Sequence, residues 1–74
     1  MQITIKLFAT LRDERFDSKI MEFPDNTTVG EIINKLNIDK KDAAIIFINN
    51  KHAEFDTVLK EGDTLAVFPP IGGG

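Results

Sequence analysis

Residues 28–36 read Thr-Val-Gly-Glu-Ile-Ile-Asn-Lys-Leu and predict the one substantial helix of the chain. Thr28 can act as the N-cap, and Glu31, three residues later, completes the pattern of a capping box. The apolar residues recur at helical spacing and form a single stripe: Val29, Ile32, Ile33 and Leu36. One apolar stripe has to be buried against another apolar face. We therefore expect this helix to lie on one face of a sheet.

The segments on either side of the helix predict the strands of that sheet. Residues 2–8 alternate between apolar and polar side chains, which is typical of a half-buried strand. Further strands are predicted over 19–23, 44–48, 52–54 and 64–68, with a brief helical turn over 56–59. This order predicts an α+β fold of the β-grasp type: a mixed four- to five-stranded sheet with one main helix on one face. The first and last strands are expected to lie side by side in its middle.

The composition restricts the class of protein. The chain has 74 residues, no cysteine and one histidine, so we expect one domain over 1–68, a flexible tail over 69–74 and no metal site. Twelve acidic and nine basic residues give a net charge of −3, which argues against nucleic acid as a partner. We find neither a signal-peptide pattern nor an apolar run long enough to cross a membrane. The expected protein is soluble and cytoplasmic.

The tail, Pro69-Pro70-Ile71-Gly72-Gly73-Gly74, has an unusual composition. The prolines end the last strand and direct the chain away from the sheet. The glycines lack Cβ atoms, so the tip can enter a narrow channel and bring its backbone close to a ligand. The alternative is an ordinary frayed chain end, which is the default for termini. The composition favours a functional terminus.

Three stretches resemble the MoaD/ThiS sulfur carriers, a family with the ubiquitin-like β-grasp fold. Residues 62–74, Gly-Asp-Thr-Leu-Ala-Val-Phe-Pro-Pro-Ile-Gly-Gly-Gly, are similar to the C-terminal signature of that family. Residues 7–12 resemble its opening strand and loop, and residues 28–32 resemble the start of its helix. The Phe-Pro-Pro motif is most similar to the small subunit of molybdopterin synthase.

The resemblance implies that Gly74 is the reactive residue. In such carriers a ubiquitin-activating-type adenylyltransferase uses ATP to form an acyl-adenylate, and a sulfur donor converts it into a thiocarboxylate. The loaded tail then enters the large subunit of molybdopterin synthase and gives sulfur to a pterin precursor. The carrier itself is expected to bind no cofactor and to have no catalytic activity alone.

Strand alternation predicts a surface to which these partners bind. If Ile3, Ile5 and Leu7 face the helix, then Phe8 points to the opposite face, and the same reasoning places Phe68 and Phe47 there. Exposed apolar patches often mark interfaces. The alternatives are that the 9–18 segment folds over these rings, or that the third strand is buried on both faces. By resemblance, Arg12 pairs with an acidic site on the activating enzyme, although a solvated arginine fits the sequence equally well.

Three other functions fit parts of the pattern. The first alternative is a carrier for thiamin or another sulfur-containing metabolite. The second is a ubiquitin-like modifier joined to lysines through Gly74, and the third is an interaction module with an inert tail. A stand-alone enzyme is disfavoured because the sequence shows no nucleophile–base pair and no metal set. His52 is expected to be an ordinary surface histidine beside a turn.

Overall fold

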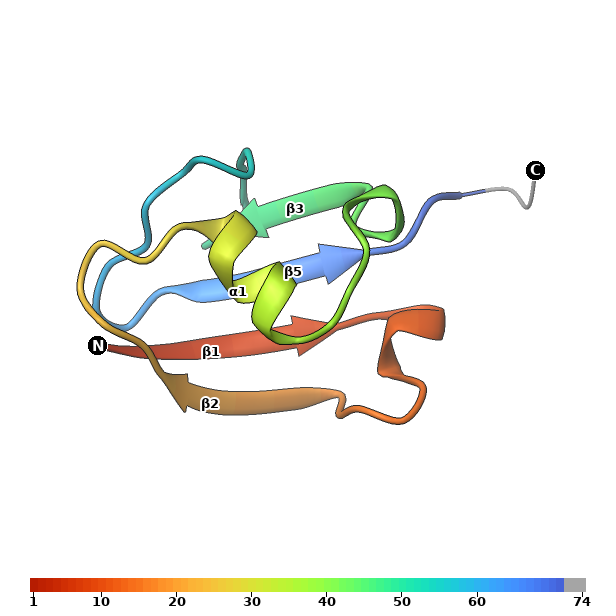
Figure 1. Ribbon diagram of the computed structural model, residues 1–74, viewed down its shortest axis with the longest axis horizontal. Coiled ribbons are helices and arrows are strands. Elements are labelled where there is room, and N and C mark those ends of the chain that lie inside the picture. The colour runs from red at the N-terminus through yellow and green to blue at the C-terminus, as the bar shows by residue number, and fades with distance from the viewer. Residues whose placement is uncertain (72–74) are drawn as a thin grey trace.

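The computed structural model describes residues 1–71 and arranges them as a sheet with one main helix (Figure 1). The two elements labelled η are short 3-10 helices. In chain order the elements are β1 (Gln2–Leu7), η1 (Ala9–Arg12), β2 (Ser18–Glu22), α1 (Val29–Lys35), η2 (Lys40–Asp42), β3 (Ile45–Ile48), β4 (Lys51–His52) and β5 (Thr64–Phe68).

The strands of the described region form one sheet in the order β2-β1-β5-β3-β4. β1 and β5 are parallel neighbours, and the other adjacent pairs are antiparallel. In the central pair Ile5 lies opposite Leu65, and Leu7 lies opposite Val67. The mixed sheet, with the first and last strands adjacent and inside it, is therefore confirmed, and with it the β-grasp arrangement.

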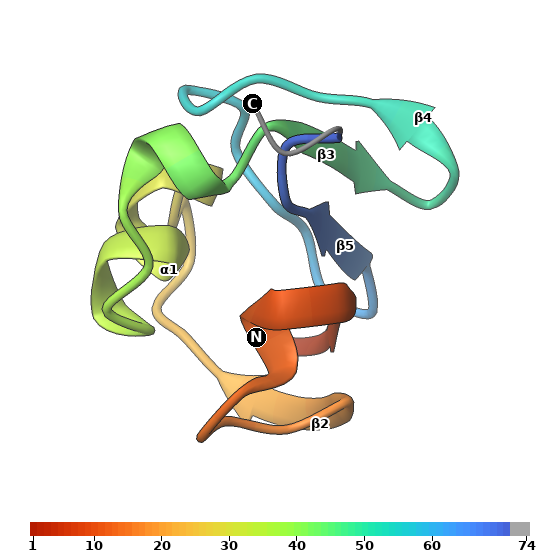
Figure 2. The same cartoon turned by 90° about the vertical axis from the view of Figure 1, so that its right-hand side faces the viewer.

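The apolar core lies between this sheet and α1. Figure 2 shows α1 and the chain that follows it on one side of the sheet. Alternate residues of the central strands point to this side and are buried, as the sequence predicts. The fully buried side chains are Ile3, Ile5 and Leu7 from β1, Val29, Ile32 and Ile33 from α1, Leu65 and Val67 from β5, and Leu59. Each such side chain contributes about 1.5–3 kcal/mol relative to an exposed one.

The predicted capping box opens α1. The Glu31 amide donates to Thr28 Oγ1 over 3.3 Å, and the Thr28 amide donates to Glu31 Oε1 over 3.0 Å. The helix has seven residues, which correspond to about 10 Å of length. Within the described residues, no helix is long and apolar enough to cross a membrane.

The prediction of a helical turn over 56–59 is wrong. The backbone around this stretch instead pairs with the start of α1: the Thr57 carbonyl accepts from the Val29 amide over 3.0 Å, and the Phe55 carbonyl accepts from the Gly30 amide over 2.8 Å. The first amides of a helix have no partner inside it. The segment satisfies these amides, and this contact with a distant part of the chain overrides its local preference.

The strand expected over 52–54 is instead β4 at Lys51–His52, because the turn before it takes only two residues. Asn49 and Asn50 form this turn with positive φ values of 51° and 69°. Two-residue hairpin turns require this conformation, and asparagine tolerates it. The other strands match their predicted ranges to within one residue at each end.

The 9–18 segment begins with η1 and is anchored by the buried Leu11. Arg15 ties this segment to the end of α1. Its guanidinium donates to the carbonyls of Leu36 (3.2 Å), Asn37 (2.9 Å) and Leu11 (3.3 Å). Unpaired carbonyls at a helix C-terminus favour a cationic donor. The segment is therefore held against the helix.

We predict that Thr28→Ala lowers the free energy of unfolding by about 1 kcal/mol, because it removes the capping acceptor. For a domain of this size, that loss corresponds to a fall in Tm of about 4–8 °C. Thermal unfolding followed by circular dichroism measures it. Thr28→Ser keeps the hydroxyl and is the matched control. Equal losses in both variants would contradict the role of the capping box.

Candidate functional site

The candidate site begins where the tail leaves the sheet. Figure 1 shows the chain after β5 running away from the domain. The Phe68 carbonyl accepts from the Ala44 amide over 3.0 Å, so the backbone is fixed up to this residue. Pro69 is half-buried, Pro70 is exposed, and the Ile71 side chain is 88% exposed. Gly72, Gly73 and Gly74, which the sequence marks as the functional tip, lie outside the described residues.

Four rings form a continuous row beside this point, on the sheet face opposite α1. Phe8 stacks on Phe68 with ring centroids 4.2 Å apart and an interplanar angle of 12°. Phe47 meets Phe68 edge to face at 5.9 Å, and His52 meets Phe47 edge to face at 5.8 Å. We call these residues the aromatic row. The predicted placement of Phe8, Phe47 and Phe68 away from the helix is confirmed.

The three phenylalanines remain partly accessible. Phe8, Phe47 and Phe68 are each half-buried, so the third strand is not buried on both faces. From the 9–18 segment, Arg12 covers part of the row: its guanidinium carbon lies 5.5 Å from the centroid of the Phe8 ring. The segment therefore covers one end of the row and leaves the rest open.

Arg12 is bonded inside the chain as well as exposed. Its Nε donates to the Leu7 carbonyl over 2.9 Å and lies 3.6 Å from Asp17 Oδ1. The Arg12 and Asp17 side chains are 46% and 78% exposed, so this ion pair is weak in water. The sequence left open whether Arg12 is solvated or held for a partner. The structure places it over Phe8 at the end of the aromatic row, where a partner can reach it.

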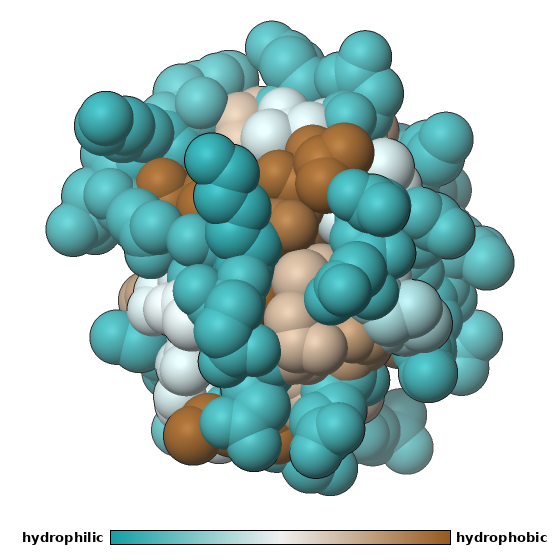
Figure 3. All heavy atoms as spheres, turned by 90° about the vertical axis from the view of Figure 1, so that its left-hand side faces the viewer, coloured by the Kyte–Doolittle hydropathy of each residue, from teal (hydrophilic) through white to brown (hydrophobic). Residues whose placement is uncertain are grey.

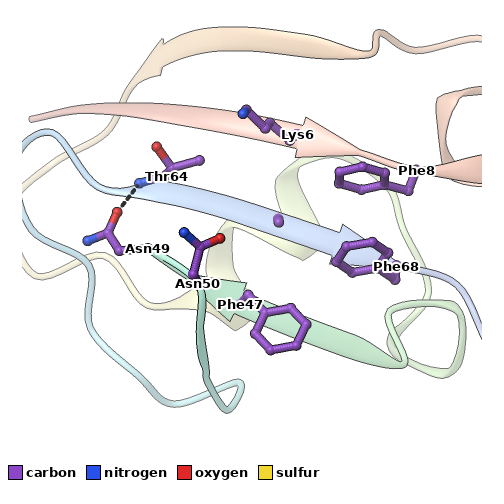
Figure 4. Close-up of a pocket in the computed structure, with 8 residues that line it drawn as sticks. Lys6, Phe8, Phe47, Asn49, Asn50, Thr64 and Phe68 are labelled. Atoms are coloured by element: carbon purple, nitrogen blue, oxygen red, sulfur yellow. Dashed lines mark hydrogen bonds between the residues drawn. The ribbon is translucent and has the colours of Figure 1, made fainter.

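A hollow of about 370 Å³ extends from the aromatic row along β5 (Figure 4). Aromatic rings line one end and polar side chains line the other. The lining residues are Lys6, Phe8, Phe47, Asn49, Asn50, Thr64, Ala66 and Phe68. Lys6, Thr64 and Ala66 were not singled out from the sequence. Strand alternation was the available signal, since it puts Lys6 on the same face as Phe8 and puts Ala66 on the same face as Phe68.

Other candidate chemistry is not assembled in the described region. His52 is exposed on β4, as expected of a surface histidine, although it also contacts Phe47. Within residues 1–71, no group of three His, Asp or Glu side chains is placed to hold a metal ion. Figure 3 shows the end of the molecule opposite the tail, where hydrophilic residues cover most of the surface around a few hydrophobic ones.

We predict that the stack of Phe8 on Phe68 contributes about 0.5–1.5 kcal/mol beyond simple burial. A double-mutant cycle with Phe8→Ala and Phe68→Ala, read by urea unfolding, measures this coupling energy. The control cycle pairs Phe8→Ala with Phe55→Ala, because Phe55 packs near the start of α1 and has no stacking contact with Phe8. A coupling no larger than that of the control would contradict the stack.

The sequence was compared with models of known protein families and with curated proteins. The family model described as ThiS family matches residues 5–74. A comparison with curated proteins finds no match.

Solved structures share the fold. SAMP1, the small archaeal modifier protein 1 of Haloferax volcanii, is 24% identical over 100% of both chains, with a TM-score of 0.81. A putative molybdopterin converting factor subunit 1 from Pyrococcus furiosus is 24% identical over 96% of this chain and 99% of that chain, with a TM-score of 0.75. A chain from the complex of subunits 1 and 2 of the molybdopterin-converting factor of Helicobacter pylori is 20% identical over 100% of both chains, with a TM-score of 0.66. Because the family model covers nearly the whole sequence, the chain belongs to the ThiS family of small, ubiquitin-like sulfur carriers.

Proposed function

We propose that this chain donates sulfur as the small subunit of a molybdopterin synthase-type complex, with the Gly74 carboxylate as the working group. The observation that carries the proposal is the Pro-Pro-Ile-Gly-Gly-Gly tail, which leaves the sheet beside a half-exposed aromatic row. The likeness to the converting-factor subunits of Pyrococcus furiosus and Helicobacter pylori supports the pterin pathway. The product would be a precursor of the molybdenum or tungsten cofactor.

The chemistry follows from the low reactivity of a carboxylate. A free carboxylate is a poor electrophile, so an adenylyltransferase first joins Gly74 to AMP from ATP and releases pyrophosphate. A sulfide equivalent from the sulfur donor then attacks the activated carbonyl, and AMP leaves. The resulting thiocarboxylate is a soft nucleophile delivered by proximity. In this scheme the carrier needs no acid, base, metal or cofactor of its own, and ATP is used by the activating enzyme.

The tail supplies reach. Six extended residues span about 20 Å, enough to pass from the surface of the carrier into a partner's active site. Ile71, the only tail residue beyond the prolines with a side chain, is 88% exposed and free to contact such a channel. The end of the chain carries no Cβ, so a narrow channel admits it.

Two proteins have to receive this tail in turn: the adenylyltransferase and the large synthase subunit. We propose that both bind the open sheet face, with Phe8, Phe47 and Phe68 as apolar contacts and Arg12 at their edge. Aromatic residues, phenylalanine included, are enriched in protein–protein interfaces. The proposed setting is the cytoplasm, with neither nucleic acid nor a membrane as a partner.

A ubiquitin-like modifier is the second candidate, favoured by the likeness to SAMP1. Modification begins with the same adenylate, but the acyl group goes to a lysine amine instead of a sulfide. A carrier for thiamin or another sulfur-containing metabolite shares the whole carrier chemistry. These candidates differ in the acceptor, so the products distinguish them.

The test is the intact mass of the purified chain after incubation with ATP, the adenylyltransferase of the same organism and a sulfur donor. We expect a gain equal to the exchange of one oxygen for one sulfur. Adding the large synthase subunit and a pterin precursor should reverse this gain. Isopeptide-linked products would favour the modifier instead.

Two altered chains assign the reaction to Gly74. Deletion of Gly74 shortens the tail and should abolish the gain. The shortened chain still ends in a glycine carboxylate, so a full-length chain with a C-terminal carboxamide is the matched variant that removes only the reactive group. A mass gain in the carboxamide chain would contradict the proposal, as would no gain in the unaltered chain.

A further inference from the structure

The hollow beside the aromatic row is lined by large side chains around one small residue. Ala66 is the smallest residue on its lining and lies on β5, between Lys6 on β1 and Phe47 on β3. Figure 4 shows the Phe8 and Phe68 rings at the tail end of the hollow and Asn49 toward the other end. The hollow therefore has a small residue at its floor and an aromatic wall nearest the tail.

The charge of the hollow differs from that of the whole chain. The chain carries a net charge of −3, yet Lys6 is the only charged residue among the described residues of the lining. Within the described residues, no carboxylate lies within 4.0 Å of the Lys6 ammonium. The carboxylate of Asp63, the residue next to Thr64 in the sequence, is bonded within the chain: Oδ1 accepts from the Asn49 side-chain amide and Oδ2 from the Lys60 backbone amide, each over 2.8 Å. The hollow thus presents one cation beside an apolar wall.

We propose that this hollow receives an apolar side chain of the adenylyltransferase that takes the tail first, with a carboxylate of that enzyme placed against Lys6. The inference rests on the proposed function and adds the chemistry of the partner surface. Charge complementarity supports it, because a carboxylate is the group that an unpaired ammonium selects. The position supports it too, since the hollow adjoins Phe68, the last residue before the tail.

A second copy of this chain fits the hollow less well. In a two-fold dimer the same surface patch faces itself. Both copies would then bring Lys6 to the contact, and the described lining residues include no carboxylate to balance it. Like charges brought together in this way oppose association. We therefore assign the hollow to a different protein.

Two variants change the hollow in different ways. Ala66→Leu fills the floor, and Lys6→Glu reverses the charge at its side. Thr4→Leu adds a leucine on the same face of β1 but outside the hollow, and Lys51→Glu makes the same change in net charge from β4. These two are the matched controls. Unchanged circular dichroism melting curves verify that all four variants fold.

The test measures the affinity of each full-length chain for the adenylyltransferase by titration calorimetry, at low and at high salt. We expect Ala66→Leu and Lys6→Glu each to weaken binding by about 10-fold or more at low salt, with the controls unchanged. Only for Lys6→Glu should high salt restore part of the lost affinity, because salt screens the repulsion between the new glutamate and the partner carboxylate. Affinities of the two variants that match the controls would overturn the proposal. So would a wild-type dimer that Ala66→Leu dissociates, because a second copy would then occupy the hollow.

The mass assay separates this inference from the proposed function. If the wild-type chain is thiocarboxylated normally and both variants bind unchanged, the partner does not occupy the hollow, and the proposed function is unaffected. If the wild-type chain is not thiocarboxylated but both variants bind more weakly, the proposed function is wrong, and the hollow is still a binding surface for the partner. A wild-type chain that neither binds nor reacts contradicts both.

Discussion

The parallel pairing of β1 with β5 is the constraint on which the rest of the structure depends. Ile5 opposite Leu65 and Leu7 opposite Val67 bury their side chains against α1. Because side chains alternate along a strand, the same register turns Phe8 and Phe68 to the other face and brings their rings into contact. A shift of one residue in either strand would expose the core and separate the rings. The register of β1 and β5 therefore determines both the buried core and the candidate interface. The tail begins directly after Phe68, which belongs to that interface.

Much of the fold was predictable because it depends on local patterns. Alternation in 2–8 and 64–68 predicted both faces of the sheet, and Thr28 with Glu31 predicted the start of α1. The prediction of a helical turn over 56–59 was wrong because the backbone of this region pairs with the start of α1: Thr57 with Val29, and the preceding Phe55 with Gly30. No local pattern contains that information. The same applies to η1, which is held in place in part by the contact of Arg15 with the end of α1.

The candidate site shows the same division. The shared face of Phe8, Phe47 and Phe68 followed from alternation, but the contact of His52 with Phe47 did not. The hollow over Ala66 did not follow either, because a hollow depends on which neighbours surround a small residue. Arg12 was singled out from the sequence, but its hydrogen bond to Leu7 and its place over Phe8 are known only from the structure. A carrier with this chemistry needs no catalytic side chains, so its sequence says little about its pathway.

The central claim is that partners bind the open sheet face beside the root of the tail. The most direct measurement is the amide NMR spectrum of the ¹⁵N-labelled chain during titration with the adenylyltransferase in the absence of ATP, so that binding is seen without reaction. The account predicts that the largest changes in shift and line width occur at Lys6, Phe8, Phe47 and Ala66 and in the tail. Changes confined to α1 and the 55–59 segment, with the aromatic row undisturbed, would contradict it.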